Sequence, residues 1–327
     1  MVLHRFILLA ALAAGLAFIF GCQRTAPTAK PALRLAYSTA SLENVFWQRV
    51  TKGARDEATK ARADLRVVDA QGDARKQLSD IEDLVQQRMD AILISPYQSD
   101  PIVPAVLAAN KARIPVVIVD IGVKGGDYAA LIISDNLAGG RLAGEFIASK
   151  IDREGPVAHI SAQPGVENAR KRGEGFAQVM KERGIKIVAS QTAYSERAKG
   201  MEVMENILQA HPDLRAVFCE NDEMALGATR ALGPLRGRPA GRKDVIVVGF
   251  DGNPDALAAI RKGEMAATVA QQPEEMGRMG VRIALKALKG EAVAKTVQVP
   301  VTLITRDNAA HVAQPPSAVS APKGAHR

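Results

Sequence analysis

IPVVIVD (residues 114–120) is a nearly continuous apolar run, rich in β-branched residues, that ends on Asp120. Three later runs have the same form and end on carboxylate or amide side chains: ALIISDN (130–136), AVFCEND (216–222) and VIVVGFDG (245–252). Runs of this kind are typical of parallel strands that helices cover on both faces. Open parallel sheets bind ligands at the carboxyl ends of their strands. The polar ends of these strands therefore predict where a small polar molecule would be held.

Strands and helices alternate between residues 33 and 306, which predicts an α/β fold with parallel sheets. The expected strands are 33–38, 65–70, 90–95, 114–120, 130–134, 156–161, 186–190, 216–219, 245–250, 265–271 and, as the last strand, 296–304. The expected helices are 46–61, 74–88, 102–111, 137–150, 169–183, 199–210, 224–232, 254–262 and 274–288. About eleven strands are many for one sheet. We therefore expect two similar α/β lobes that divide near residues 134–139.

The composition is that of an ordinary globular protein with ample core, since 47% of the 327 residues are hydrophobic and 24% are charged. The net charge of +8 comes from basic residues scattered beside acids, and only Arg170-Lys171-Arg172 forms a short cluster. This pattern indicates a solvated surface and no nucleic-acid partner. After Cys22 only Cys219 remains, inside a buried strand, where we expect it to fill core.

The N-terminus has the pattern of an export signal. Residues 6–20 form an uninterrupted apolar run that is too short for a comfortable membrane span and fits a signal-peptide core. Ile19-Phe20-Gly21-Cys22 resembles a bacterial lipobox, in which the Cys is lipidated. We therefore expect a signal peptide at 1–21, a tether at 22–32 and a protein of the periplasm or cell envelope that is lipid-anchored through Cys22. A plain signal peptide or an uncleaved anchor is the alternative.

The sequence lacks the motifs of common enzymes. No P-loop, dinucleotide-binding glycine fingerprint, H-E-x-x-H, C-x-x-C or G-x-S-x-G occurs. His159 is the only histidine in an expected strand, and a lone strand histidine is more typical of core. No set of residues in the sequence matches the combination of a nucleophile, a base and a group that orients the base. We expect no catalytic residues, no metal and no cofactor, and the polar strand ends then indicate binding.

The residue types at the strand ends suit a sugar. Sugar hydroxyls need carboxylates as acceptors and Arg, Asn or Gln as donors, while their C–H faces need aromatic surface. Phe46 and Trp47 follow Asn44 just beyond the first strand, although both could simply anchor the next helix. The other candidates have equally simple structural alternatives: a turn or helix cap for Asp120 and Asp251, an N-cap for Asn221, a solvated helix face for Arg172, and a crossing between lobes for Gln271.

From about residue 33 to 306 the chain resembles the periplasmic sugar-binding proteins of ABC importers, in particular the ribose-binding proteins. The segments that carry this resemblance are STASLENVFWQ (38–48), PVVIVD (115–120), SDNLAGGRLAGEFIA (134–148), ARKRGEGF (169–176), AHPDLRAVFCENDEMALGATRAL (210–232), VVGFDGNPD (247–255) and AATVAQQPEEMG (266–277). The resemblance implies two Rossmann-like lobes, a hinge of three crossover strands and closure around a monosaccharide. The ligand contacts that it implies are Asn44, Phe46, Trp47, Asp120, Arg172, Asn221, Asp251 and Gln271.

The same resemblance implies lobes of 33–134 plus 272–298 and of 135–271 plus 299–307. Residues 308–327 have no periodicity and few large apolar residues, so we expect a disordered tail there. The partners that the resemblance implies are a monosaccharide and an ABC permease in the inner membrane, and we expect a monomer. A module that presents sugar to a chemoreceptor or a histidine kinase is the alternative function. Two positions depart from the ribose-binding pattern: Ile121 stands where Arg follows the aspartate, and Ser195, beside Tyr194, stands where a third aromatic is usual. Another pentose, a hexose, a deoxy sugar or a polyol therefore stays open.

Overall fold

The computed structural model describes residues 32–151, 155–233 and 244–311. The described residues from Leu33 onward belong to one compact unit. No helix within the described residues is both long enough and apolar enough to cross a membrane. The predicted signal peptide and the anchor residue Cys22 lie outside the described residues, as does the tail beyond residue 311.

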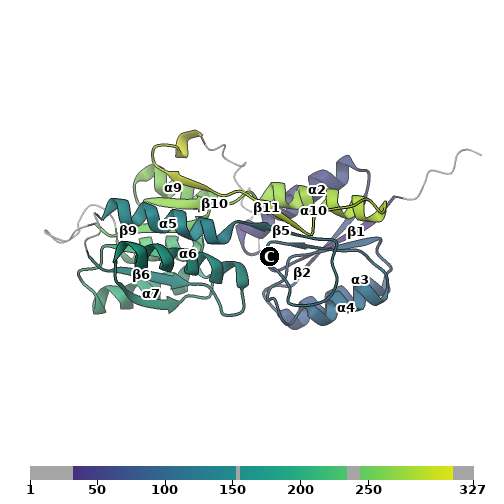
Figure 1. The fold of residues 1–327 in the computed structure, drawn as a ribbon, viewed down its shortest axis with the longest axis horizontal. Coiled ribbons are helices and arrows are strands. Elements are labelled where there is room, and N and C mark those ends of the chain that lie inside the picture. Colours follow the sequence, from purple (N-terminus) through teal and green to yellow (C-terminus); the bar gives the residue numbers. More distant parts are fainter. Residues whose placement is uncertain (1–31, 152–154, 234–243, 312–327) are drawn as a thin grey trace, which may run out of the picture. The chain divides into compact units, whose positions relative to one another are not determined.

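The fold consists of two six-stranded sheets (Figure 1). The first sheet has the order β11 (Thr296–Val299), β5 (Ala130–Ser134), β4 (Val116–Val119), β3 (Ala91–Ile94), β1 (Arg34–Thr39) and β2 (Asp64–Asp69), and its strands are all parallel. The second has the order β12 (Thr302–Thr305), β10 (Ala267–Ala270), β9 (Ile246–Asp251), β8 (Ala216–Cys219), β6 (Val157–Ser161) and β7 (Ile187–Thr192), and only β12 is antiparallel to its neighbour. The predicted α/β class with two parallel-dominated sheets is confirmed.

Helices cover both faces of the first sheet. The helices α2 (Val45–Lys60) and α10 (Pro273–Leu288) pack together on one face, and α3 (Ala74–Gln86) and α4 (Val103–Lys111) pack on the other (Figure 1). Strand β4 shows the consequence, because Val117 and Val119 belong to one hydrophobic cluster and Val116 and Ile118 to another, all at most 1% exposed. The apolar run that opened the sequence is therefore a strand buried on both faces. We call this sheet with its four helices the first lobe.

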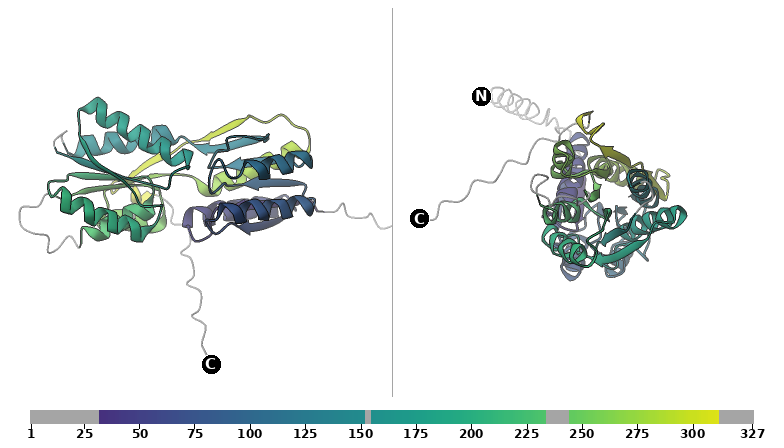
Figure 2. Two further views of the ribbon diagram at one scale, coloured as in Figure 1. Left: turned by 90° about the horizontal axis from the view of Figure 1, so that it is seen from below. Right: turned by 90° about the vertical axis from the view of Figure 1, so that its left-hand side faces the viewer.

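The second sheet and its five helices form the second lobe. These helices are α5 (Asn136–Lys150), α6 (Glu167–Arg183), α7 (Arg197–Ala210), α8 (Asp222–Ala231) and α9 (Pro254–Lys262). Helix α5 packs on α6, and α7 packs on α8. Figure 2 shows both sheets with their covering helices from two further directions. Cys219 is fully buried in β8, which confirms its place in the core.

Small residues let α5 and α6 approach closely. A Cβ atom added to Gly140 would lie 2.0 Å from the backbone oxygen of Arg172, and one added to Gly139 would lie 2.6 Å from the ring of Phe250. The paired glycines therefore allow α5 to pack closely on its neighbours. The contact also has a consequence for function, since it holds the backbone of Arg172 firmly against α5.

The prediction of one last strand at 296–304 is wrong. Thr296–Val299 pairs parallel with β5 in the first sheet, while Thr302–Thr305 pairs antiparallel with β10 in the second. Pro300 and Val301 lie between them, and proline cannot donate to a strand ladder. The chain also passes between the lobes after β5 and after β10, so it crosses three times in all within the described residues. Beyond β12, Ala309–His311 form a short 3-10 helix inside the segment expected as tail.

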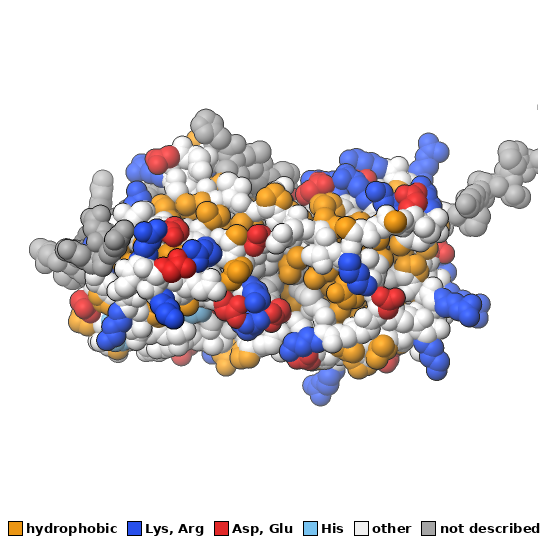
Figure 3. All heavy atoms as spheres, viewed as in Figure 1, with side chains coloured by type: hydrophobic (Ala, Val, Ile, Leu, Met, Phe, Trp, Pro, Cys, Tyr) orange, Lys and Arg blue, Asp and Glu red, His pale blue; other side chains and the backbone are white. Residues whose placement is uncertain are grey.

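The surface carries mixed charge. On the face shown in Figure 3, lysine and arginine side chains lie among aspartates and glutamates. Several form ion pairs, such as Arg282 with Glu57 at 2.9 Å and Arg141 with Glu182 at 2.8 Å. Ion pairs this exposed contribute little to stability. On this face the basic side chains are therefore interspersed with acidic ones.

Candidate ligand-binding site

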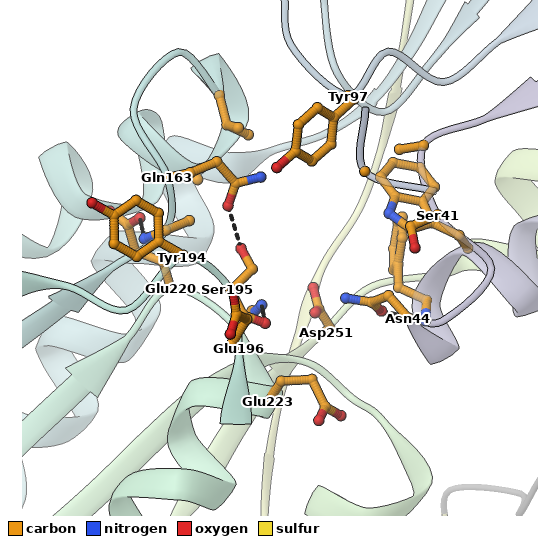
Figure 4. Close-up of a pocket in the computed structure, with 18 of the residues that line it drawn as sticks. Ser41, Asn44, Tyr97, Gln163, Tyr194, Ser195, Glu196, Glu220, Glu223 and Asp251 are labelled. Carbon is orange, nitrogen blue, oxygen red and sulfur yellow. Dashed lines mark hydrogen bonds between the residues drawn. The ribbon is translucent and has the colours of Figure 1, made fainter. Parts of the chain in front are cut away.

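A cavity of about 580 Å³ lies at the carboxyl ends of the strands of both lobes, and Figure 4 shows part of its lining. All eight predicted ligand residues line it: Asn44, Phe46, Trp47, Asp120, Arg172, Asn221, Asp251 and Gln271. They come from β1–α2 and β4 of the first lobe and from α6, β8–α8, β9 and the end of β10 of the second. The structure thus brings together residues that lie up to 227 positions apart in sequence (Asn44 and Gln271).

The aromatic pair forms the apolar wall of the cavity. The rings of Phe46 and Trp47 meet edge to face, with centroids 4.8 Å apart and an interplanar angle of 83°. Both side chains also belong to the core under α2, so they anchor this helix and line the cavity at once. Asn44 is the N-cap of α2, where its Oδ1 accepts a hydrogen bond from Phe46 N at 2.9 Å. Its amide nitrogen is directed toward Asp251 (Figure 4).

Two buried aspartates have unusual backbone conformations. The φ angles are 71° at Asp120 and 119° at Asp251, values that residues with a side chain rarely adopt. Such strain persists where surrounding structure enforces it and is typical of functional sites. For Asp251, a turn was the alternative to ligand contact, and the structure shows the turn and the cavity lining together. The strained backbone directs this carboxylate toward Arg172 and Gln271.

Burial raises the pKa of both carboxyl groups. Desolvation raises the pKa of Asp120 to about 6, although the charge of Arg172 and a hydrogen bond from Asn168 oppose it. Desolvation raises the pKa of Asp251 to about 7, against the opposing effects of Arg172 and of the hydrogen bond from Gln271. Each carboxylate is therefore poorly compensated without a ligand. A hydroxyl donated to either oxygen would favour the ionised form.

A solvated helix face was the alternative to ligand contact for Arg172, and its burial rules that alternative out. Its side chain is buried, with Nε donating to Asn136 Oδ1 at 2.8 Å and Nη1 donating to the Glu220 backbone oxygen at 2.8 Å. Nη1 also lies 3.4 Å from Asp251 Oδ1, and the guanidinium stacks 3.8 Å above the ring of Phe250. Helix α5 packs closely on α6, and this face of α6 lines the cavity. Stacking on Phe250 and hydrogen bonds hold the Arg172 guanidinium there.

Asn221 and Gln271 complete the wall that the second lobe contributes. Asn221 caps α8 through Oδ1, which accepts from Met224 N at 2.9 Å, so the N-cap reading is correct and the side chain still lines the cavity. Gln271 donates through Nε2 to Asp251 Oδ1 at 2.7 Å. Beneath them, the fully buried Asp222 accepts from Asn253 N and from Thr268 Oγ1, both at 2.7 Å. Asp222 thereby holds the turn that carries Asp251.

Sequence reasoning missed several lining residues. Asn168 lies one helical turn before Arg172 on the same face of α6, and this spacing of four residues is the signal that could have identified it. Glu220 directly precedes Asn221, but its carboxylate faces Ala162 N at 2.7 Å and His159 Nε2 at 3.0 Å. Gln163 accepts from Ser195 Oγ at 2.7 Å (Figure 4).

Both positions that depart from the ribose-binding pattern line the cavity. Ile121 is 4% exposed and Ser195 contacts Gln163, whereas the neighbouring Tyr194 is 54% exposed. Two α/β lobes with a polar and partly aromatic cavity at the ends of their strands are typical of the class of two-lobed solute-binding proteins.

Comparison with known proteins agrees with this class. Residues 35–292 match the family model of the periplasmic binding protein domain. The chain is 43% identical to the ribose import binding protein of Bacillus subtilis (strain 168), covering 85% of this chain and 88% of that protein. It is 34% identical to the D-allose-binding periplasmic protein of Escherichia coli (strain K12), covering 80% and 86%. The chain therefore belongs to the periplasmic binding protein domain family.

A solved structure shows the same fold. It is the periplasmic binding protein component of the arabinose ABC transporter from Shewanella sp. ANA-3, bound to α- and β-L-arabinofuranose. It superposes with a TM-score of 0.79 at 33% sequence identity and covers 85% of this chain and 93% of its own. The predicted resemblance to ribose-binding proteins of this fold is confirmed.

Proposed function

We propose that the protein is the substrate-binding protein of an ABC importer and that it captures a monosaccharide between its two lobes. The observation that carries this proposal is the composition of the cavity. It places the aromatic pair Phe46–Trp47 of the first lobe together with the buried Asp251–Arg172–Gln271 network of the second. Flat apolar surface beside charged acceptors and donors is the combination that a sugar ring requires.

In the proposed complex, Phe46 and Trp47 pack against the C–H faces of the ring. Asp120 and Asp251 accept hydrogen bonds from ligand hydroxyls, and Arg172, Asn44, Asn221 and Gln271 donate to ligand oxygens. The proposed lobes are 33–134 plus 272–298 and 135–271 plus 299–307, and the three crossings between them form the hinge. The lobes close on the sugar, and the closed form is what the permease recognises.

The ligand that we propose is a pentose such as ribose or a related sugar. The relatives' names give ribose and D-allose, and the solved structure holds arabinofuranose. Ile121 contributes no hydrogen-bond donor where ribose-binding proteins usually have Arg. A sugar oxygen left without a partner in a buried site costs about 1–3 kcal/mol. Ligands that present a C–H edge to Ile121 should therefore bind best.

Ligand binding is tested by two independent signals on a panel of D-ribose, D-allose, L-arabinose and myo-inositol. Ligand at about 100 times its dissociation constant should stabilise the protein by about 2.7 kcal/mol, seen as a raised melting temperature. Trp47 is the only tryptophan in the chain and lines the cavity, so its fluorescence should change with the same dissociation constant. Trp47→Phe should remove the fluorescence signal while a thermal shift remains. A panel of sugars and polyols that shifts neither signal would contradict the proposal.

The proposed location is the periplasm, with Cys22 as a lipid anchor, and the proposed partner is an ABC permease in the inner membrane. We propose that the protein acts as a monomer and binds without catalysis. The relatives' names describe import, which favours transport over presentation of the sugar to a chemoreceptor. Mass spectrometry of the mature N-terminus should find a diacylglyceryl-modified Cys22. A mature protein that begins at Met1 would refute the anchor.

A further inference from the structure

Asp120 and Asn168 connect the two lobes inside the cavity. Asp120 follows β4 of the first lobe, and Asn168 lies in the first turn of α6 in the second. Asn168 Nδ2 donates to Asp120 Oδ2 at 2.7 Å, and the two side chains are only 3% and 2% exposed. Both residues line the ligand cavity. A charged hydrogen bond that is shielded from water is stronger than an exposed one.

The orientation of the Asn168 amide is fixed from its other side. Its Oδ1 accepts a hydrogen bond from Ala169 N at 2.8 Å, so the Nδ2 group is the one that faces Asp120. Helix α6 has Val166 as its N-cap, which makes no side-chain capping bond, and Asn168 Oδ1 satisfies one free N–H of the first turn instead. The Nδ2 group takes no part in that contact and donates to Asp120.

The neighbourhood of Asp120 offers no other direct donor among the described side chains. Arg172 directs its guanidinium to Asn136, Glu220 and Asp251. Ile121, the next residue in the chain, carries no polar group. Asp120 Oδ1 is buried and has no hydrogen-bond partner in the part of the chain that the structure describes. One carboxylate oxygen is therefore held by the opposite lobe, and the other remains to accept from a ligand.

We propose that Asn168 is a positioning residue for the ligand site, which binds Asp120 across the cleft and thereby couples lobe closure to ligand capture. This inference rests on the proposed function. In this arrangement the bond from Asn168 fixes the Asp120 carboxylate in the cavity wall, beside the apolar side chain of Ile121. Ile121, the residue after Asp120, has no side-chain donor. Asn168 supplies that donor from the second lobe.

The test uses one ligand of the panel D-ribose, D-allose, L-arabinose and myo-inositol, namely the one that raises the melting temperature of the wild type most. Asn168→Ala should weaken binding at least tenfold, chiefly through faster dissociation in stopped-flow fluorescence of Trp47, because the closed form loses a bond between the lobes. The melting temperature without ligand should also fall, because Asp120 loses its buried donor, but the ligand-free protein should stay folded. Asn110→Ala is the matched control, since Asn110 bonds only to the backbone of Asp127 in the first lobe and lies outside the cavity. Its dissociation constant should stay that of the wild type.

Asn168→Asp provides a readout that a purely structural role would not change. Two carboxyl groups at this distance cannot both be ionised, so they must share a proton. Binding by this variant should therefore improve, relative to the wild type, as the pH falls from 8 to 5.5. The inference is overturned if Asn168→Ala binds as tightly as the wild type or if Asn168→Asp follows the wild-type pH profile. A wild type that binds no member of the panel instead refutes the proposed function, and the inference falls with it.

Discussion

Replacement of Asp251 by Ala is expected to abolish sugar binding while the ligand-free protein stays folded. The carboxylate is buried between Arg172 and Gln271 and is proposed to accept hydrogen bonds from ligand hydroxyls. Hydrogen bonds to a charged group contribute about 1.5–3 kcal/mol each. The loss of two such bonds corresponds to more than a hundredfold in the dissociation constant. Arg172 keeps its hydrogen bonds to Asn136 and Glu220 in this variant, so its cation is not left without partners.

The experiment needs a second variant, because Ala at the φ of 119° found here is itself strained. Asp251→Asn keeps the size of the side chain and removes only its charge, and it should also weaken binding strongly. Isothermal titration gives the affinity, and circular dichroism with a melting curve checks the fold. Asp213→Ala, at an exposed position in the same lobe, should bind as the wild type does. Tight binding by both Asp251 variants would show that the residue only forms the turn.

The fold was largely predictable because its signals are local. Each central strand reads as a short β-branched run, and its alternate residues pack into separate clusters on the two faces, as β4 shows. The run 296–304 was misread for the same reason. Its residues are β-forming throughout, and local pattern does not show that β11 pairs with β5 while β12 pairs with β10. Only Pro300 marked the change of sheet.

The site was less predictable, because burial at a helix face depends on the partner helix. The sequence around Arg172 is charged and resembles a solvated helix face. In the structure, however, the backbone of Arg172 packs against Gly140 of α5, and its side chain is buried in the cavity wall. Asn168 escaped notice because its partner, Asp120, is 48 residues away on the other lobe. The eight ligand residues that the family resemblance implied all line the cavity, but direct contact of each with a sugar stays a prediction.

The affinity for sugar is expected to rise with pH between about 5 and 8. Burial raises the pKa of Asp120 to about 6 and that of Asp251 to about 7, so both carboxyl groups hold protons at pH 5 in the ligand-free protein. The proposed complex needs them ionised as acceptors, and binding at low pH must therefore release protons. Linkage then predicts a dissociation constant at least tenfold higher at pH 5 than at pH 8.

The stability of the ligand-free protein should change in the opposite sense. The folded state holds protons on Asp120 and Asp251 at pH values where the unfolded chain, with an aspartate pKa of 3.8, has released them. The contribution of these two groups to the free energy of unfolding therefore falls as the pH rises from about 4 to 7 and then levels off. Titration calorimetry in buffers of different ionisation enthalpy measures the released protons directly. If sugar binds equally well at pH 5 and pH 8 with no proton release, the two carboxylates are not the acceptors that hold it.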